Sequence, residues 1–394
     1  MSDERWPPTG RSGPRPLLYL APNRWDDLRQ RPQHLAAGLA QTRAVIFVEP
    51  AAYSALGALR RRLVNHQPIS WGSRLRQFSE QLFVFTPAPT LPGSLRLRLV
   101  NRLVHRFAWG HLRPVLWRLG YDDFDVVVGW PPAYDLVRYL PARRIIYDCM
   151  DLFPDFHPGR RRLLETLEAE LARCASAVVV TSRLLERRWS DRHPRIVRIP
   201  NGVEVGTFWQ DLGSASLPVD LATLPRPRLG YVGTIGRWLD LSLLADLAGR
   251  RPECSIVLIG PIERGIKRPA APLNLYFLGE RAYSSLPHYL AGMDALIIPF
   301  RLMDLTHAVN PIKLYEYCAC GKPIAATPLD EMTVADGLCH LGAGPDAFSS
   351  AVDAALREAA RPDPARVAAR QAVARNASWD RRVAALAALL DTPD

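Results

Sequence analysis

A lysine and a glutamate three residues apart are the most informative chemical pair in this sequence of 394 residues. They are Lys313 and Glu316, within the segment NPIKLYEYCACGKPIAATPLDE. Residues three apart share one face of a helix, so this cation and this carboxylate point the same way. A nucleoside diphosphate needs both groups, the cation for its phosphates and the carboxylate for its ribose hydroxyls. The same spacing also suits an ordinary surface ion pair, and both interpretations stay open.

The neighbouring residues predict the helix that carries the pair. Pro311 suits the first helical turn, and Gly321 suits the C-terminal end. Asn310 precedes the proline and is expected to cap the helix. Because the free N–H groups of a helix N-terminus attract phosphate, Asn310 and Pro311 join the predicted nucleotide site.

A glycine-containing turn, YVGTIGRW, is the second candidate for phosphate binding. It places Gly233 and Thr234 at the end of a predicted strand, where small residues let backbone amides approach a phosphate. Arg237 follows and could add positive charge. A glycine turn of this kind is common, so it has weight only beside the lysine helix.

Short apolar runs alternate with helical patterns along the whole chain, which predicts doubly wound α/β domains with parallel sheets. A stretch rich in Pro, Gly and Ser separates two sets of runs and predicts a linker at 209–226. The expected domains are 1–208 and 227–376, with a C-terminal helix at 377–394 that packs back on the first domain. The predicted strands are 17–21, 44–49, 82–86, 125–129, 144–148, 177–182 and 195–200, then 228–235, 255–261, 275–279, 295–300 and 322–327.

The net charge of +11 is concentrated in one part of the first domain. Residues 53–118 hold eleven arginines against a single acid, Glu80. Within them, residues 95–118 predict a basic amphipathic helix, broken near Gly110 or Pro114. One interpretation is a helix that packs on a sheet with solvated arginines outside. The other is docking on an anionic membrane surface.

Composition excludes several broad classes of protein. A hydrophobic content of 48% and a charged content of 23% are those of a globular chain, not a disordered or fibrous one. The six cysteines form no C-x-x-C pair, so neither a zinc site nor a disulfide framework is expected. The sequence shows no secretory signal and no run of about 18 apolar residues. We therefore expect a cytoplasmic protein without a resident metal or other cofactor.

In their order along the chain, the motifs resemble those of nucleotide-sugar glycosyltransferases with the GT-B fold. The matching pieces are NRWDDLRQRPQHLAAGLA, IIYDCMD, AVVVTSRLLERRW, IVRIPNGVEVGTF, LGYVGTIGRWLDLSLLADLA, LYFLGERAYSSLPHYLAGMDALIIPF and the NPIKLYEY segment. The chain looks most like bacterial surface-polysaccharide enzymes, near family 4 and the teichuronic-acid and xanthan types. The resemblance implies two Rossmann-like domains facing a cleft, C-terminal helices, and a donor of the UDP, GDP or dTDP type.

The resemblance also assigns residues. Many family-4 enzymes that retain the anomeric configuration have a Glu eight residues before the position of Glu316, where this chain has Ala308. In the inverting xanthan-type pattern a catalytic Asp lies four residues after a strand-closing Tyr, which corresponds to Asp151. Asp148 and Asp155 are competing candidates. Glu280, after the strand in FLGERAY, is implied to contact the base or the donor.

The segment after the first strand supplies candidates for the acceptor. Trp25, Arg31 and His34 follow that strand, with Pro32 at a helix start. These residues could bind an acceptor or its phosphate, although His34 could equally be a packing residue.

The resulting expectation is an enzyme that moves a sugar from a nucleotide sugar to a glycan or lipid-linked acceptor. We expect it to work without a metal ion at the cytoplasmic membrane face, with residues 95–118 against the anionic surface. Two alternatives stay open. One is a nucleotide-sugar epimerase of the same fold, and the other is a protein that binds an anionic polymer through the arginine-rich segment. Recognisable nucleic-acid stacking motifs are missing, so no nucleic-acid partner is expected.

Overall fold

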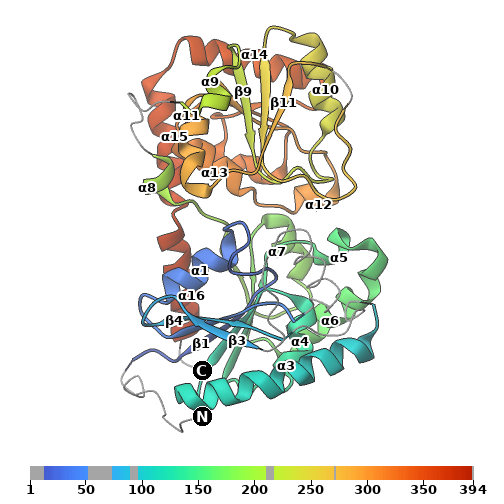
Figure 1. The fold of residues 1–394 in the computed structure, drawn as a ribbon, viewed down its shortest axis with the longest axis vertical. Helices are drawn as coiled ribbons and strands as arrows, with labels where there is room; N and C mark the ends of the chain where they lie inside the picture. The colour runs from blue at the N-terminus through green and yellow to red at the C-terminus, as the bar shows by residue number, and fades with distance from the viewer. Residues whose placement is uncertain (1–12, 52–72, 89–95, 210–216, 270–271, 393–394) are drawn as a thin grey trace. The chain divides into compact units, whose positions relative to one another are not determined.

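The computed structural model describes residues 13–51, 73–88, 96–209, 217–269 and 272–392 (Figure 1). Its contacts divide the chain into two compact units. The second unit runs from Pro200 to Arg381, and the first contains the chain before it and the residues from Arg382 onward. The described part of the predicted linker, including helix α9 (Val219–Ala222), thus lies in the second unit.

In the described part of the first unit, eight strands form one sheet in the order β3-β4-β2-β1-β5-β6-β7-β8. All neighbours are parallel except β3, which runs antiparallel to β4 at the edge. The seven predicted strands are confirmed, and β3 is an additional one. The bounds are β1 (Leu17–Leu20), β2 (Val45–Val48), β3 (Arg74–Gln77), β4 (Leu82–Thr86), β5 (Asp125–Val128), β6 (Arg144–Cys149), β7 (Ala177–Val180) and β8 (Ile196–Arg198).

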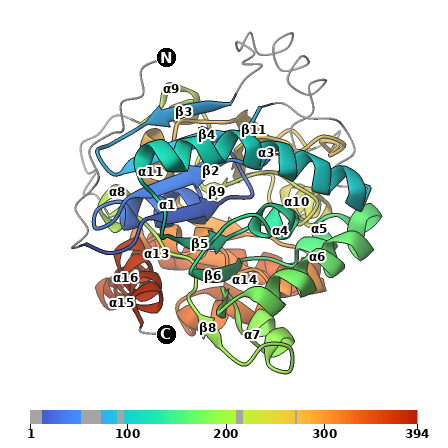
Figure 2. The same cartoon turned by 90° about the horizontal axis from the view of Figure 1, so that it is seen from below.

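The helices of this unit pack around the sheet, as seen from below in Figure 2. The end of the chain belongs to them, because the last helix, α16 (Trp379–Asp391), places Val383 against Gly38. A Cβ at Gly38 would come within 2.4 Å of Val383, so the glycine is required for this close approach. The other helices are α1 (Arg31–Leu39), α3 (Arg98–Leu119), α4 (Tyr134–Val137), α5 (Phe153–Phe156), α6 (Arg161–Cys174) and α7 (Arg183–Trp189).

Helix α3 is continuous, so the predicted break near Gly110 or Pro114 is wrong. A proline inside a helix removes the hydrogen bond to the carbonyl four residues earlier, which here belongs to Gly110. Both residues lie on the exposed side of α3, where water can satisfy that carbonyl. Three of the eleven arginines in the basic segment, Arg60 to Arg62, lie outside the described residues.

The second unit contains a parallel sheet in the order β11-β10-β9-β12-β13-β14. Its five predicted strands are confirmed, and the two-residue β14 is an additional one. The strands are β9 (Arg228–Val232), β10 (Ser255–Ile259), β11 (Leu275–Gly279), β12 (Ala295–Ile298), β13 (Ile324–Ala326) and β14 (His340–Leu341). The helices besides α9 are α8 (Val205–Phe208), α10 (Leu241–Arg250), α11 (Leu286–Ala291), α12 (Asp304–His307), α13 (Ile312–Ala319), α14 (Gly344–Ala360) and α15 (Pro364–Asn376).

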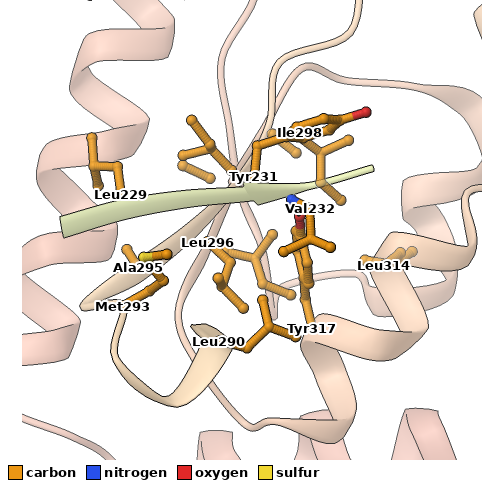
Figure 3. Packing of buried hydrophobic residues seen from close by; sticks show 14 of the residues in the cluster. Leu229, Tyr231, Val232, Leu290, Met293, Ala295, Leu296, Ile298, Leu314 and Tyr317 are labelled. Carbon is orange, nitrogen blue, oxygen red and sulfur yellow. Dashed lines mark hydrogen bonds between the residues drawn. The ribbon is translucent and has the colours of Figure 1, made fainter. Parts of the chain in front are cut away.

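The core of the second unit holds α13 against the central strand β9 (Figure 3). Leu314 and Tyr317 of α13 are fully buried. The Tyr317 hydroxyl accepts a hydrogen bond of 2.9 Å from the Val232 amide, at the end of β9. This contact fixes the helix that carries Lys313 and Glu316 beside the carboxyl end of the strand.

Candidate functional site

Lys313 and Glu316 form an ion pair on α13, with 3.2 Å between Lys313 Nζ and Glu316 Oε2. The pair differs from an ordinary surface pair because the Glu316 side chain is only 4% exposed. The lysine side chain is 24% exposed, so part of it reaches solvent. A cation held by a buried carboxylate is well placed to bind a phosphate, because its side chain is already ordered.

The Lys313 side chain lies over the predicted glycine turn. Gly233 adopts a φ of +151°, and a Cβ at this position would come within 2.8 Å of Lys313 Cε. The Gly233 amide donates to the Ile259 carbonyl at 2.8 Å, so it cannot serve a phosphate as predicted. The next amide, that of Thr234, donates to no described residue. A lysine, a glycine turn and an available amide are therefore gathered at one place.

Asn310 does not cap α13, which corrects the prediction. The N-cap is Pro311, and no side chain caps the helix. The buried Asn310 amide group instead donates to Tyr315 Oη at 3.0 Å and to Glu331 Oε2 at 2.7 Å. Its Oδ1 accepts from the Asn201 amide at 2.9 Å. Asn310 thus supports the start of α13 through Asn201, Tyr315 and Glu331, instead of offering a group to a ligand.

Arg237 and Glu280 are the two remaining members of the predicted donor set. Arg237 is half-buried, and Glu280 is exposed directly after β11. A pocket of about 390 Å³ lies after β12 and β13, with Phe300 and Thr327 in its wall. Neither Arg237 nor Glu280 lines this pocket.

Asp151 lies in a bend two residues after β6 and is half-buried. Its carboxylate accepts no hydrogen bond from any described residue. Burial raises the pKa of Asp151 to about 7; Arg31 opposes this shift, and Asp148 adds to it. A carboxylate with such a pKa can take up a proton near neutral pH, as a general base must.

Asp148, the main competitor, is committed to a buried network instead. It receives hydrogen bonds from Tyr19 Oη at 2.7 Å and from Arg31 Nη2 at 2.8 Å, and it is fully buried. Arg31 is 2% exposed and also donates to the Ile199 carbonyl at 2.9 Å. The structure therefore corrects the prediction for Arg31, which supports Asp148 and influences Asp151 instead of reaching an acceptor.

The other two predicted acceptor residues are also largely enclosed. The Trp25 amide donates to Glu49 Oε1 at 3.0 Å, and its ring packs edge-on against Phe47. His34 is 5% exposed inside α1, which favours the packing role. Asp155, the remaining alternative base, forms an ion pair of 2.8 Å with Arg161.

Sequence reasoning missed the residues that support the site. Glu331 is buried and accepts a hydrogen bond from the Asn310 side chain. Asn201, at the start of the second unit, donates to Asn310 twice, from its backbone amide to Oδ1 and from its side chain to the backbone carbonyl. Glu331 ends the segment that contains Lys313, so its position was a usable signal. No local pattern relates Asn201 to Asn310, because they are more than 100 residues apart.

Helix α3 has two apolar faces where one was predicted. Val104, Ala108 and Leu112 are buried, whereas Leu99, Leu103 and Phe107 are 68%, 50% and 52% exposed. Arginines surround the exposed apolar stripe, and three of them, Arg106, Arg113 and Arg118, form no ion pair with a described residue. Arg98 is different, since it pairs with Asp135 at 3.1 Å and with Glu170 at 2.5 Å.

Two absences concern the described residues alone. None of their helices has the length and apolar character needed to cross a membrane. No three His, Cys, Asp or Glu side chains in this part of the chain gather closely enough to hold a metal ion.

Comparison with known proteins matches residues 226–358 to the family "Glycosyl transferases group 1". A protein of Bacillus subtilis (strain 168), provisionally named a teichuronic acid biosynthesis glycosyltransferase, is 25% identical over 223 residues. The match covers 50% of this chain and 54% of that protein, about half the relative's length.

The solved structures that resemble this chain have the GT-B fold. Sucrose-phosphate synthase from Thermosynechococcus elongatus has a TM-score of 0.70 at 15% identity, covering 95% of this chain and 98% of the other. A second structure, described as "Trehalose-6-phosphate from E. coli bound with UDP-2-fluoro glucose", has a TM-score of 0.68 at 13% identity. The alignment covers 96% of this chain and 99% of the other. These comparisons confirm the GT-B fold and the resemblance to glycosyltransferases.

Proposed function

We propose that this chain transfers a sugar from a nucleoside-diphosphate sugar to an acceptor hydroxyl. The match of residues 226–358 to the group 1 glycosyl transferases supports this activity. The observation that carries the proposal is the position of Lys313 over the turn at Gly233, inside the matched region. A cation, a free amide and a helix N-terminus suit a diphosphate, which carries negative charge on several oxygens.

In this proposal, each donor residue has a separate role. Lys313, the Thr234 amide and the first amides of α13 bind the diphosphate. Glu316 accepts hydrogen bonds from the ribose hydroxyls through the oxygen that Lys313 does not occupy. Arg237 adds positive charge, and Glu280 contacts the base. Asn310 and Pro311 fix the start of α13. The same groups stabilise the charge that develops on the diphosphate as it leaves, without a metal ion.

Asp151 serves as the general base of an inverting transfer. It takes the proton from the acceptor hydroxyl as the hydroxyl oxygen attacks the anomeric carbon. The bond between that carbon and the diphosphate breaks, and its electron pair leaves with the nucleotide. Support comes from the pKa of about 7 and from the lack of a described hydrogen-bond donor to the carboxylate.

The acceptor in this proposal is a lipid-linked or growing glycan at the cytoplasmic face of the membrane. The name of the Bacillus subtilis relative refers to a cell-surface polysaccharide, which supports an acceptor of this class. The exposed leucines and unpaired arginines of α3 suit an anionic lipid surface, because such a surface accepts apolar side chains and attracts cations.

A transfer assay tests the proposal. The protein is incubated with UDP-, GDP- and dTDP-sugars labelled in the sugar, together with a bacterial lipid extract. We expect release of the nucleoside diphosphate and transfer of the label to the organic phase. Conversion of the free nucleotide sugar to an isomer, without any acceptor, would indicate the epimerase instead.

A further inference from the structure

A second polar pocket lies in the first unit, between α6 and α7, the neighbouring green helices of Figure 2. Its volume is about 570 Å³, within the range of small-molecule sites. Neither Asp151 nor any residue of the second unit lines this pocket. It is therefore separate from the groups proposed for donor binding and for catalysis.

Positive charge dominates the lining of this pocket. The arginines outnumber the two glutamates, Glu165 and Glu168, by four to two. Glu165 pairs at 2.8 Å with Arg161, which also pairs with Asp155, and Glu168 pairs at 3.0 Å with Arg188. The side chains of the other two arginines, Arg173 and Arg192, form no hydrogen bond or ion pair with a described residue.

Arg188 is an ordered cation in the wall of this pocket. Its Nη2 donates to Glu168, which is itself held by the Tyr147 hydroxyl at 2.7 Å. Its Nε is buried and has no hydrogen-bond partner. Because this Nε has almost no accessible surface, a ligand in the pocket cannot reach it, and Arg188 contributes to the site through its charge. Glu168 thus holds the Arg188 guanidinium in place in the wall of the pocket.

We propose that this pocket binds the phosphate group of a soluble ligand, either a phosphomonoester or a diphosphate. The guanidinium groups of Arg173 and Arg192 provide the donors, and the charge of Arg188 adds to the attraction. Planar guanidinium groups match phosphate oxygens in pairs of hydrogen bonds, which makes arginine the preferred residue for such recognition. Ala169 and Ala172 have short side chains in the lining, which leaves space for the rest of the ligand.

Isothermal titration calorimetry with inorganic phosphate and with pyrophosphate, at constant ionic strength, tests this site. Every protein carries Lys313→Ala, so that phosphate bound beside α13 does not contribute. The test variant adds Arg173→Gln and Arg192→Gln, which leave the Arg188–Glu168 pair intact. The matched control adds Arg162→Gln and Arg195→Gln, two exposed arginines of the same unit that do not line the pocket.

We expect saturable binding of at least one probe, with a dissociation constant at least tenfold higher in the test variant and within twofold of the parent in the control. Absence of saturable binding by the parent would overturn the proposal. Equal weakening by both pairs of substitutions would also overturn it, since net charge would then explain the binding. Binding to phosphatidic-acid vesicles without binding to either soluble probe would assign the arginines to a lipid surface and reject a soluble ligand.

Discussion

At the scale of single residues, Asp151 is set apart by its raised pKa and its unpaired carboxylate. We expect Asp151→Asn to lower turnover by about 10²–10⁴-fold, because the amide has the same shape but cannot accept a proton. Donor affinity should not change. In the wild type, turnover should rise with pH through about 7, as the base loses its proton. Steady-state kinetics from pH 5.5 to 8.5 measure both effects.

The same substitution should alter stability with a defined dependence on pH. The folded state keeps the Asp151 proton up to about pH 7, whereas the unfolded chain loses it near pH 4. The wild type should therefore lose stability as pH rises between these values. The advantage of Asp151→Asn should grow across this window and then level off. Near-full turnover of the variant, or a product that keeps the donor's anomeric configuration, would contradict the role of a base.

The buried pair of Arg31 and Asp148 should contribute to stability and not to proton transfer. Asp148→Asn leaves the Arg31 charge buried without its counterion, a change that typically costs about 3–5 kcal/mol. Urea denaturation measures the free energy of unfolding. Asp26→Asn, which breaks an exposed pair with Arg76, is the control and should cost less than about 1 kcal/mol. Equal effects of the two substitutions would argue against the buried network.

Residue roles were predictable where they depend on local spacing. The shared face of Lys313 and Glu316 follows from their separation of three residues, and the ion pair is present. Arg31 and Asn310 were assigned wrongly in part because one decisive partner of each lies far along the chain. Asp148 is 117 residues from Arg31, and Asn201 is 109 residues from Asn310. No spacing rule relates residues so far apart.

At the scale of elements, most strands were predictable because parallel strands buried on both faces are continuous apolar runs. Strand β3, RLRQ, lies mostly exposed at the sheet edge, so it lacks such a run. Helix α3 was predictable as a helix. Its second, exposed apolar face was not, because the sequence pattern does not show which apolar side chains find a partner in the fold.

The exposed face of α3 carries the prediction at this scale. Replacing Arg106, Arg113 and Arg118 with glutamine should weaken binding to anionic vesicles by about 100-fold, since each arginine contributes about 1 kcal/mol near such a surface. Vesicle sedimentation measures the binding. The control replaces Arg162, Arg195 and Arg361, which are exposed elsewhere. Unchanged vesicle binding by the α3 variant at low salt would leave α3 as a packing helix only.

At the scale of the whole molecule, the two-sheet architecture could be predicted from the alternation of strands and helices. The boundary between the two compact units could not be predicted from composition. The first unit ends at Ile199, before the stretch rich in Pro, Gly and Ser, and it includes the chain again from Arg382. The Arg43 guanidinium binds Asp391 at 2.7 Å in this returning segment. A C-terminal helix that packs back on the first domain was expected, but the residue at which the first unit ends depends on contacts formed in the folded chain, so local composition does not give it.

The proposed chemistry predicts that transfer needs no divalent ion, because Lys313 and backbone amides would offset the charge of the leaving diphosphate. Turnover measured in excess EDTA should equal that of the untreated enzyme. Loss of activity in EDTA that Mg²⁺ or Mn²⁺ restores would show that a metal ion performs this task instead.

The most direct test of the central claim is the affinity for UDP, GDP and dTDP, measured by calorimetry on the wild type and on two variants of α13. Lys313→Ala should weaken the best-bound nucleotide by about 10–100-fold, the usual effect of losing a hydrogen bond to a charged group. Glu316→Gln should weaken it too, through the ribose. Lys267→Ala, which removes an exposed lysine of the same unit, should leave the affinity unchanged. Wild-type affinity in both α13 variants, or no nucleotide binding by the wild type, would contradict the donor site.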